Sequence, residues 1–369
     1  MLVFSILGYA SIFDGGLTRA VIRSIAMEEA NIALHNRIVG TASCAVLGIS
    51  IFAMLLLYFG ADNIVNLLSV SEAAKDDTTS AFKLLAFVIP PYLLSLVWFA
   101  YPEGLQQFRI LNILKTISGS LIALLPVAGI LIKPTLVYAL GGFLIARLIT
   151  LGIAYLPCRK SIGKNIFDFD AKTLWNLLCF GGWITVSNIV SPLMVYADRF
   201  LLSNFLGAGR VAFYTAPSEI IARMSIIPGA VAKTIFPLFS KLQGHAINPA
   251  KTAFWGLLVV CMLIALPVFF FAGQILTIWL GTSYGNESPT ILRILLVGFV
   301  FNAIAQVPYA QIQANGRSKE TALLHLGELL PYIALLATLV HLYGLFGAAV
   351  AWTIRVIVDY ILLEILVRK

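Results

Sequence analysis

The sequence predicts an all-α, polytopic membrane protein with two homologous helical lobes. Three observations support this prediction: the composition, a series of apolar segments long enough to span a membrane, and a repeat of the first half in the second. The chain has 369 residues, of which 60% are hydrophobic and only 11% are charged, and its mean hydropathy is +0.94. A soluble core of this size does not need so much apolar surface, so the composition favours a membrane protein.

Apolar segments occur along the whole chain, and about 20 apolar residues are enough for one membrane-spanning helix. Four full spans are expected in the first half, at roughly 39–60, 81–101, 111–132 and 135–157. Six are expected in the second half, at roughly 174–197, 211–236, 252–272, 290–312, 321–342 and 345–366. Residues 1–13 form a partial span, unless that helix continues past Asp14 toward Ala26. About eleven spans are therefore predicted, with the first helix of the N-terminal lobe missing.

The segment between the two sets of spans is polar and basic. Residues 158–173 contain four cations and two carboxylates. We expect them to form a cytoplasmic linker between an N-terminal lobe of about five spans, residues 1–157, and a C-terminal lobe of six spans, residues 174–369. The net charge of +8 is explained by basic loops of this kind, so no nucleic-acid partner is expected.

The two lobes share residues at a constant spacing. Three pairs of identical residues are each 208 residues apart, namely Tyr101 and Tyr309, Arg109 and Arg317, and Arg147 and Arg355. One such coincidence carries little weight, but several at the same offset indicate homologous halves.

The distribution of lysine and arginine predicts the orientation in the membrane. One set of loops holds 16 of these residues, and the loops on the opposite side hold 6. The basic set consists of residues 14–37, 102–116, 158–173, 233–251 and 313–320 and the C-terminus. We expect this set to be cytoplasmic and residue 1 to face outward. The lobes then share one orientation and are related by an axis along the membrane normal.

Three arginines lie near the middle of predicted spans: Arg147, Arg223 and Arg355. An arginine at the bilayer centre costs about 2.5–3.5 kcal/mol on insertion scales, so it normally faces inward and has a function. Arg223 has Glu219 one turn earlier, and Arg355 has Asp359 one turn later. Pairs at this spacing share a helix face, so we expect two local ion pairs. Arg147 has no carboxylate at this spacing.

These charged residues are the candidate functional residues. The three arginines are predicted to bind the substrate, because a guanidinium in a wet cavity suits a phosphate or carboxylate group. Glu219 and Asp359 are predicted to relay a coupling ion, H⁺ or Na⁺. The four cysteines show no CxxC spacing, so neither a disulfide framework nor a metal site is expected. No catalytic residue and no other cofactor are predicted.

Several short motifs resemble a known transporter family. In the second half they are Asp198-Arg199-Phe200, Leu206-Gly207, Tyr214 and Ile235-Phe236-Pro237 with Ser240-Lys241. In the first half the motif is Phe13-Asp14-Gly15-Gly16-Leu17-Thr18-Arg19, and paired turns are found at Glu103-Gly104-Leu105-Gln106 and Gln313-Ala314-Asn315-Gly316-Arg317. In order and spacing these motifs resemble the Wzx-type polysaccharide flippases of the multidrug/oligosaccharidyl-lipid/polysaccharide exporter (MOP) superfamily. Within this resemblance Asp14, Arg19, Asp198 and Arg199 are motif or gating residues.

The resemblance implies a MATE-like architecture of two six-helix lobes around a cationic cavity. It also implies that the protein flips undecaprenyl-diphosphate-linked oligosaccharides across the inner membrane by alternating access. Such export would serve O-antigen, capsule or exopolysaccharide assembly, and a polysaccharide polymerase and chain-length proteins would be partners besides membrane lipid.

Three alternatives remain open. A lipid II flippase has a cargo with the same diphosphate. A MATE-type drug exporter would need an acid-lined cavity for cationic drugs, and the three central arginines argue against one. A membrane glycosyltransferase or polymerase is the alternative from another class, and its best support is the carboxylate pair Asp76-Asp77 on an outward loop.

Overall fold

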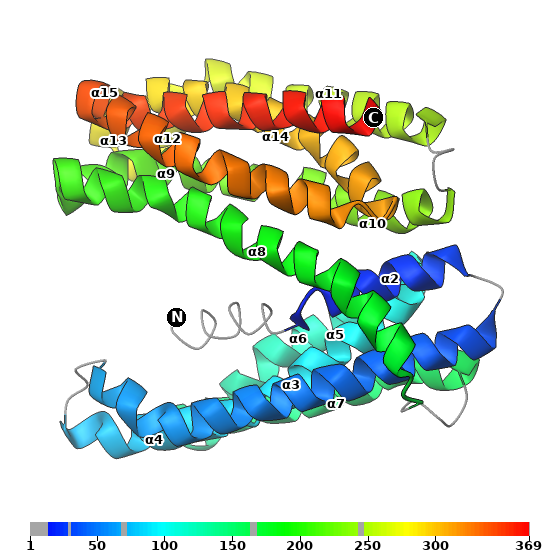
Figure 1. Cartoon of the computed structure of the whole chain (residues 1–369). Helices are drawn as coiled ribbons and strands as arrows, with labels where there is room; N and C mark the ends of the chain where they lie inside the picture. Colours follow the sequence, from blue (N-terminus) through cyan, green and yellow to red (C-terminus); the bar gives the residue numbers. More distant parts are fainter. Residues whose placement is uncertain (1–13, 29–30, 68–71, 163–167, 243–246, 369) are drawn as a thin grey trace. The chain divides into compact units, whose positions relative to one another are not determined.

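The structure is a computed structural model that describes the chain except residues 1–13, 29–30, 68–71, 163–167, 243–246 and 369 (Figure 1). The described residues form helices and contain no β-strand. The chain divides into two compact units, residues 1–185 and residues 186–369. The all-α prediction is confirmed.

The first unit contains the helices α2 to α7 and the start of α8. Their bounds are α2 Leu17–Met27, α3 Ile32–Leu67, α4 Glu72–Ala86, α5 Ile89–Gly104, α6 Phe108–Ile132, α7 Leu136–Ile162 and α8 Ala171–Leu206. Four stretches here are long and apolar enough to cross a membrane: Ile32–Val65, Lys75–Gly104, Phe108–Ile132 and Leu136–Arg159. They confirm the four full spans predicted before residue 158, whereas the partial span at 1–13 lies outside the described residues.

The second unit contains the rest of α8 and the helices α9 to α15. Their bounds are α9 Ala208–Met224, α10 Ile226–Leu242, α11 Ile247–Phe270, α12 Ala272–Leu280, α13 Thr282–Glu287, α14 Pro289–Ala314 and α15 Ser318–Arg368. Gly344, with φ 60° and ψ −130°, divides α15 into a first half, residues 318–343, and a second half, residues 345–368. The six spans predicted after residue 173 therefore all have a helical counterpart, with two of them in α15.

The predicted polar segments are more helical than expected. The predicted loop 14–37 contains α2, because Leu17, Val21 and Ile25 form an apolar face that is buried. The predicted linker 158–173 is shortened, since α7 continues to Ile162 and α8 begins at Ala171. The unit boundary at residue 185 lies inside α8. Asp76 and Asp77, expected on a loop, are exposed residues of α4.

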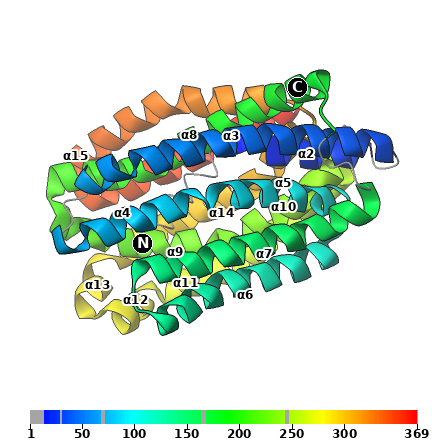
Figure 2. The same ribbon diagram turned by 90° about the horizontal axis from the view of Figure 1, so that it is seen from below.

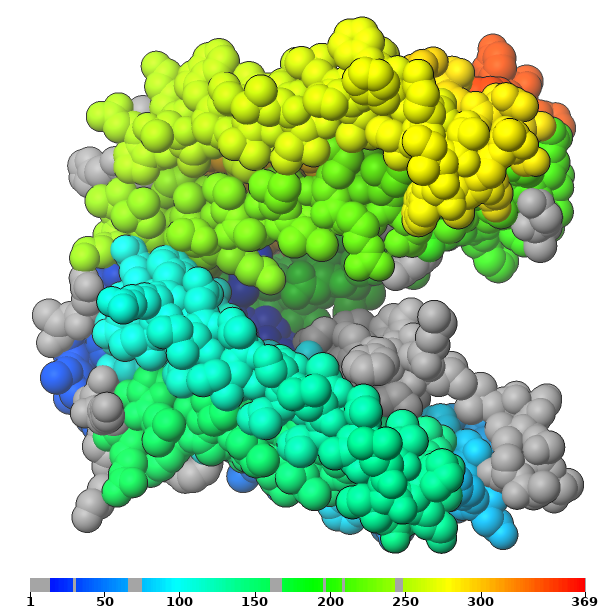
Figure 3. All heavy atoms as spheres, turned by 180° about the vertical axis from the view of Figure 1, so that it is seen from behind, coloured from blue at the N-terminus to red at the C-terminus, as the bar shows by residue number. Residues whose placement is uncertain are grey.

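One helix in each unit is much more buried than its neighbours. In the first unit this is α5, of whose 16 residues 12 are buried; in the second it is α14, with 15 of 26. By contrast only three of the 25 residues of α6 are buried, and Figure 3 shows its side chains at the surface. Figure 2 shows α6 beside α7. Each unit is therefore built around one central helix.

The two central helices end in the same turn, which confirms the internal repeat. In the first unit the backbone N–H groups of Leu105, Gln106 and Gln107 bond to the carbonyls of Tyr101, Glu103 and Pro102. In the second unit the bonds run from Asn315, Gly316 and Arg317 to Gln311, Gln313 and Ile312. Every donor and acceptor recurs 210 residues later. The predicted offset of 208 is wrong at this turn, where Arg109 corresponds to Lys319 and not to Arg317.

Candidate functional site

Arg147 is the charged centre of the first unit. Its side chain leaves α7 and places the guanidinium carbon 4.5 Å from the ring centroid of Tyr92 in α5 and 5.1 Å from that of Phe143. Both rings can stabilise the cation through their negative faces. Within the described residues no carboxylate pairs with Arg147, and its buried Nε has no hydrogen-bond partner. Among the residues that the structure describes, the positive charge of Arg147 is therefore held by aromatic rings and not by a carboxylate.

The predicted motif at Asp14 forms the start of α2 in the first unit. The Asp14 carboxylate accepts hydrogen bonds from the backbone N–H of Thr18, at 3.2 and 3.3 Å, and from its hydroxyl, at 2.8 Å. Gly15 and Gly16 both have positive φ, which a glycine adopts without steric cost. A Cβ on Gly16 would lie 2.2 Å from the carbonyl oxygen of Gly181 in α8. The motif thus begins α2 and lets it pack closely on α8.

A second cation of the first unit also lies on an aromatic ring. The guanidinium carbon of Arg23 in α2 is 5.0 Å from the ring centroid of Phe180 in α8. Arg23 lines a cavity of about 320 Å³ together with Glu28, Thr173 and Asn176. Arg19, the other motif arginine, is half-buried on α2.

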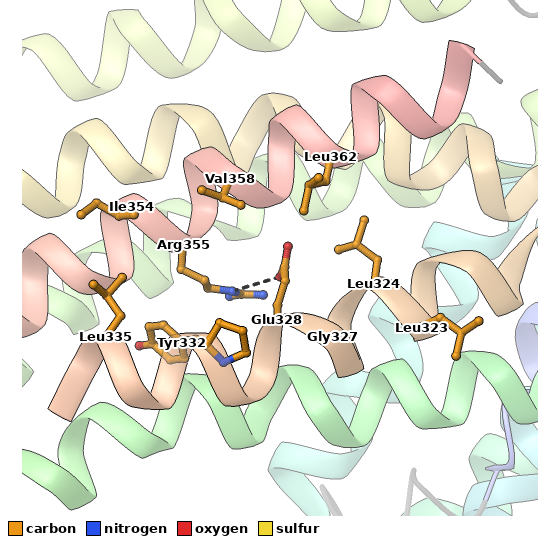
Figure 4. A pocket seen from close by; sticks show the side chains of 11 residues that line it. Leu323, Leu324, Gly327, Glu328, Tyr332, Leu335, Ile354, Arg355, Val358 and Leu362 are labelled. Atoms are coloured by element: carbon orange, nitrogen blue, oxygen red, sulfur yellow. Dashed lines mark ion pairs between the residues drawn. The ribbon is translucent and has the colours of Figure 1, made fainter. Parts of the chain in front are cut away.

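The second unit surrounds its central arginine with acids. Arg355, on the second half of α15, points toward Glu328 on the first half (Figure 4), and its Nε lies 3.7 Å from Glu328 Oε2. Asp359 interacts electrostatically with both Glu328 and Arg355. The ion-pair contact of its Oδ1, however, is with His325 Nε2 at 3.7 Å. The expected Arg355–Asp359 pair is therefore replaced by contacts across the α15 hairpin, which same-helix spacing cannot reveal.

This cluster is deeply buried and short of hydrogen bonds. The side chains of Arg355 and Glu328 are 11% and 9% exposed, and those of His325 and Asp359 are 7% and 9% exposed. Asp359 Oδ1 and Arg355 Nε make no hydrogen bond of normal length among the described residues, and Glu328 interacts with both Asp359 and Arg355. Two carboxylates face one guanidinium, so the cluster needs a proton or another cation to reach neutrality.

The other predicted ion pair also has a different partner. Glu219 Oε1 in α9 lies 3.0 Å from Arg199 Nη2 in α8, where we expected Arg223. Arg223, on the last turn of α9, is exposed. Arg199 reaches Glu219 from a neighbouring helix, so the pair joins α8 to α9. Within the second unit, Arg223 lines neither cavity around Arg355; Arg147 belongs to the first unit.

Asp198 has a structural contact within the second unit. It is buried in α8 and accepts a hydrogen bond from the hydroxyl of Tyr214 in α9. It also accepts one from the backbone N–H of Arg199 at 2.6 Å. The resemblance predicted Asp198 as a motif residue, and the structure shows that it ties α8 to α9.

Two cavities meet at Arg355. The larger, about 410 Å³, lies between the halves of α15 and combines Glu328, Tyr332 and Arg355 with an apolar lining of Leu323, Leu324, Leu335, Ile354, Val358 and Leu362 (Figure 4). The smaller, about 210 Å³, has a polar lining of Ser191, Asn302, Gln306, Tyr309, His325, Arg355 and Asp359. The sequence reasoning missed Glu328, although an acid inside the predicted span 321–342 was a visible signal.

The fold and the buried charges define a multi-pass membrane protein of the two-unit helical type. Solved structures with this fold are transporters: the bent form of the Vibrio cholerae MATE transporter VcmN has a TM-score of 0.84 and 17% identity, covering 100% of this chain and 86% of that one. A MOP superfamily transporter from Pyrococcus furiosus has a TM-score of 0.78 and 15% identity, covering 98% and 84%. At these identities the likeness shows the fold alone.

Sequence comparison then gives the family. The family described as "Polysaccharide biosynthesis protein" matches residues 1–243. A Shigella flexneri protein named "Putative O-antigen transporter" is 43% identical over 367 residues, which cover 98% of this chain and 87% of that protein. The chain belongs to the polysaccharide biosynthesis protein family, as the resemblance of its motifs indicated.

Proposed function

We propose that this protein flips undecaprenyl-diphosphate-linked oligosaccharides across the inner membrane for O-antigen, capsule or exopolysaccharide assembly. The two units would alternate access to the cargo, which crosses without formation or cleavage of a covalent bond. Family membership and the similarity to the Shigella flexneri protein support this class of cargo. The MATE-like fold supports a transport mechanism.

The observation that carries the proposal is the uncompensated charge of Arg147. A diphosphate that enters hydrocarbon meets a prohibitive desolvation cost, which a fixed cation within the membrane lowers. A guanidinium can offer two parallel hydrogen bonds to phosphate oxygens. The Tyr92 and Phe143 rings hold this cation without neutralising it. Arg147 is therefore the first choice for the diphosphate, ahead of Arg223, which is exposed, and Arg355, which has acidic neighbours.

The coupling ion is proposed to act mainly in the second unit. Asp359 and Glu328 together exceed the charge of Arg355 by one, so binding and release of one H⁺ or Na⁺ would switch the cluster between neutral and negative states. Glu219 remains the second coupling residue, although Arg199 already balances its charge.

Transport by Arg147 variants in proteoliposomes tests the proposal. Arg147→Lys keeps the charge but not the bidentate geometry, so we expect partial export of a radiolabelled lipid-linked oligosaccharide. Arg147→Ala should be nearly inactive and Arg147→Glu inactive, with all three proteins inserted normally. Arg293→Ala is a matched control, because Arg293 in α14 also lies near an aromatic ring, that of Phe269 at 5.8 Å.

Full export by a well-inserted Arg147→Ala protein would contradict the proposal, and misfolding of that variant would indicate a helix-packing role. The same vesicles distinguish the alternatives. Export of lipid II but not of oligosaccharide would identify a lipid II flippase, and export of a cationic dye would favour a drug exporter. A lipid-linked product of altered size would indicate a glycosyltransferase or polymerase. Co-purification would test a polymerase and chain-length proteins as partners.

A further inference from the structure

The smaller cavity of the second unit has the polar lining of a ligand site. Three elements supply it: Ser191 from α8, Asn302, Gln306 and Tyr309 from α14, and His325, Arg355 and Asp359 from the two halves of α15. Its volume of about 210 Å³ is below the roughly 300–1,000 Å³ typical of pockets for drug-sized ligands. Its occupant is therefore one small group and not a whole oligosaccharide.

The cavity walls have hydrogen-bonding capacity that the described residues leave unused. Asn302 and Gln306 lie one turn apart on α14, and neither amide side chain makes a hydrogen bond to another described residue. Each amide side chain can donate two hydrogen bonds and accept two. Asp359 Oδ1 and Arg355 Nε, both buried, make no hydrogen bond to another described residue, and each has only an ion-pair contact at 3.7 Å. Donors and acceptors thus occur side by side, which suits hydroxyl groups because each of them both donates and accepts.

The cavity also has a flat aromatic wall. The Tyr309 ring stacks on His325 with a centroid distance of 5.6 Å and an interplanar angle of 15°. Ser191 Oγ is 3.4 Å from His325 Nδ1, which adds a hydroxyl to the same wall. A sugar ring has C–H groups on its faces and hydroxyl groups around its edge. Its face can pack on the aromatic wall while its hydroxyl groups contact the polar side chains beside that wall.

The charges disfavour an anionic occupant. Asp359 lines the cavity, and Glu328 interacts with it, so the single cation Arg355 is accompanied by two acidic groups. A phosphate or an acidic sugar would find no excess positive charge there and would be repelled by each ionised acid, whereas a neutral hydroxylated ring would not be repelled.

From these observations we infer that the cavity formed by Ser191, Asn302, Gln306, Tyr309, His325, Arg355 and Asp359 binds one neutral sugar ring of the cargo. This inference rests on the proposed function and extends it: Arg147 in the first unit holds the diphosphate, and the second unit holds sugar. The cavity then contributes selectivity for neutral over acidic sugar units.

The test uses the purified full-length protein in lipid nanodiscs and four probes: the methyl glycosides of glucose, galactose, N-acetylglucosamine and glucuronic acid. Saturation-transfer NMR and calorimetry measure binding. We expect at least one neutral glycoside to bind saturably and the glucuronide not to bind. Asn302→Ala/Gln306→Ala should weaken binding by about tenfold or more, since the hydrogen bonds of both amide side chains to the sugar are lost. Gln306→Leu, which keeps the volume, gives a smaller loss if the double variant does not fold.

Arg147→Ala is the matched control, and it should bind the neutral glycoside as the wild type does. Inorganic diphosphate, measured in parallel, should bind the wild type and lose affinity only in Arg147→Ala. Diphosphate binding without glycoside binding would overturn the sugar cavity and leave the proposed flippase intact. Glycoside binding that is equal in the Asn302/Gln306 variant would also overturn the cavity. The inference would also be overturned if Na⁺ or H⁺ binds in the cavity and no glycoside does, because the cavity would then be an ion site.

Discussion

Each unit carries an arginine on the second helix of a helical hairpin, formed by α6 and α7 in the first unit and by the two halves of α15 in the second, but the charge of this arginine is treated in opposite ways. In the first unit Arg147 lies on the rings of Tyr92 and Phe143 without a paired carboxylate among the described residues. In the second unit Arg355 faces Glu328, with Asp359 next to it. The turn before each hairpin repeats bond for bond at an offset of 210 residues. Backbone architecture was thus duplicated while the charge environment diverged, so one unit is suited to an anion and the other to a cation or a neutral group.

The stability of arginine variants gives the largest expected contrast. Arg355→Ala leaves buried carboxylates without their cation, so we expect a loss of about 3–5 kcal/mol in the free energy of unfolding. Arg147→Ala leaves no charge unpaired, and we expect about 0.5–2 kcal/mol from the lost cation–π contacts. Denaturant unfolding in detergent measures both.

A double variant checks the cause of this contrast. Arg355→Met/Glu328→Gln removes the ion pair as a unit and leaves only Asp359 without the cation, so it should recover part of the stability lost in Arg355→Ala. Equal losses of unfolding free energy in Arg355→Ala and Arg147→Ala would contradict this explanation. So would a double variant that is no more stable than Arg355→Ala, because the acidic neighbours of Arg355 would then not be the cause of the contrast.

Ion coupling should differ within the second unit. Asp359 belongs to the cluster with excess negative charge, so Asp359→Asn should make transport independent of the H⁺ or Na⁺ gradient. Glu219 is balanced by Arg199, and Glu219→Gln should lower transport more than it lowers the protein level while keeping part of the ion dependence. Transport by reconstituted vesicles under imposed gradients measures both. Unchanged transport and ion dependence in Glu219→Gln would leave Glu219 as a structural ion pair.

Both units make close helix contacts through glycine. A Cβ on Gly16 would lie 2.2 Å from Gly181 O, and one on Gly347 would lie 1.9 Å from Leu339 O. Both alanine substitutions should cost about 1–3 kcal/mol by overpacking. Gly16→Ala should cost about 1–2 kcal/mol more, because its φ is 69°. Gly15→Ala is the control, since Gly15 has φ 60° but no atom near its Cβ. Equal melting temperatures for Gly15→Ala and Gly16→Ala would contradict the close approach.

Most of the fold could be predicted from the sequence because hydropathy and segment length report directly on membrane insertion. The division of α15 at Gly344 agrees with the predicted spans 321–342 and 345–366. A helix continuing toward Ala26 was left as an alternative, but Arg19 and Arg23 favoured a basic loop, so α2 was not predicted as a helix of its own. The offset of 208 came from identical residues, whereas the backbone of the turn repeats at 210.

The candidate site was predicted less well than the fold. Residues four apart in the sequence lie on the same face of one helix, so this spacing predicted the ion pairs Arg223–Glu219 and Arg355–Asp359. It carries no information about partners on other helices. The structure pairs Glu219 with Arg199 and Arg355 with Glu328, each across two helical segments. Tyr92, which holds Arg147, is 55 residues away in the chain and carries no local signal. Arg147 itself was identified correctly as an arginine without a local acid.

Binding of undecaprenyl diphosphate to purified variants tests the division between the two units most directly. The comparison uses the wild type, Arg147→Ala, and the charge-neutral Arg355→Met/Glu328→Gln, each in detergent micelles and measured by native mass spectrometry. We expect Arg147→Ala to lose affinity at least about tenfold, as the loss of a hydrogen bond to a charged group implies, and the double variant to bind as the wild type does. Loss of binding in the double variant with full binding by Arg147→Ala would contradict the account.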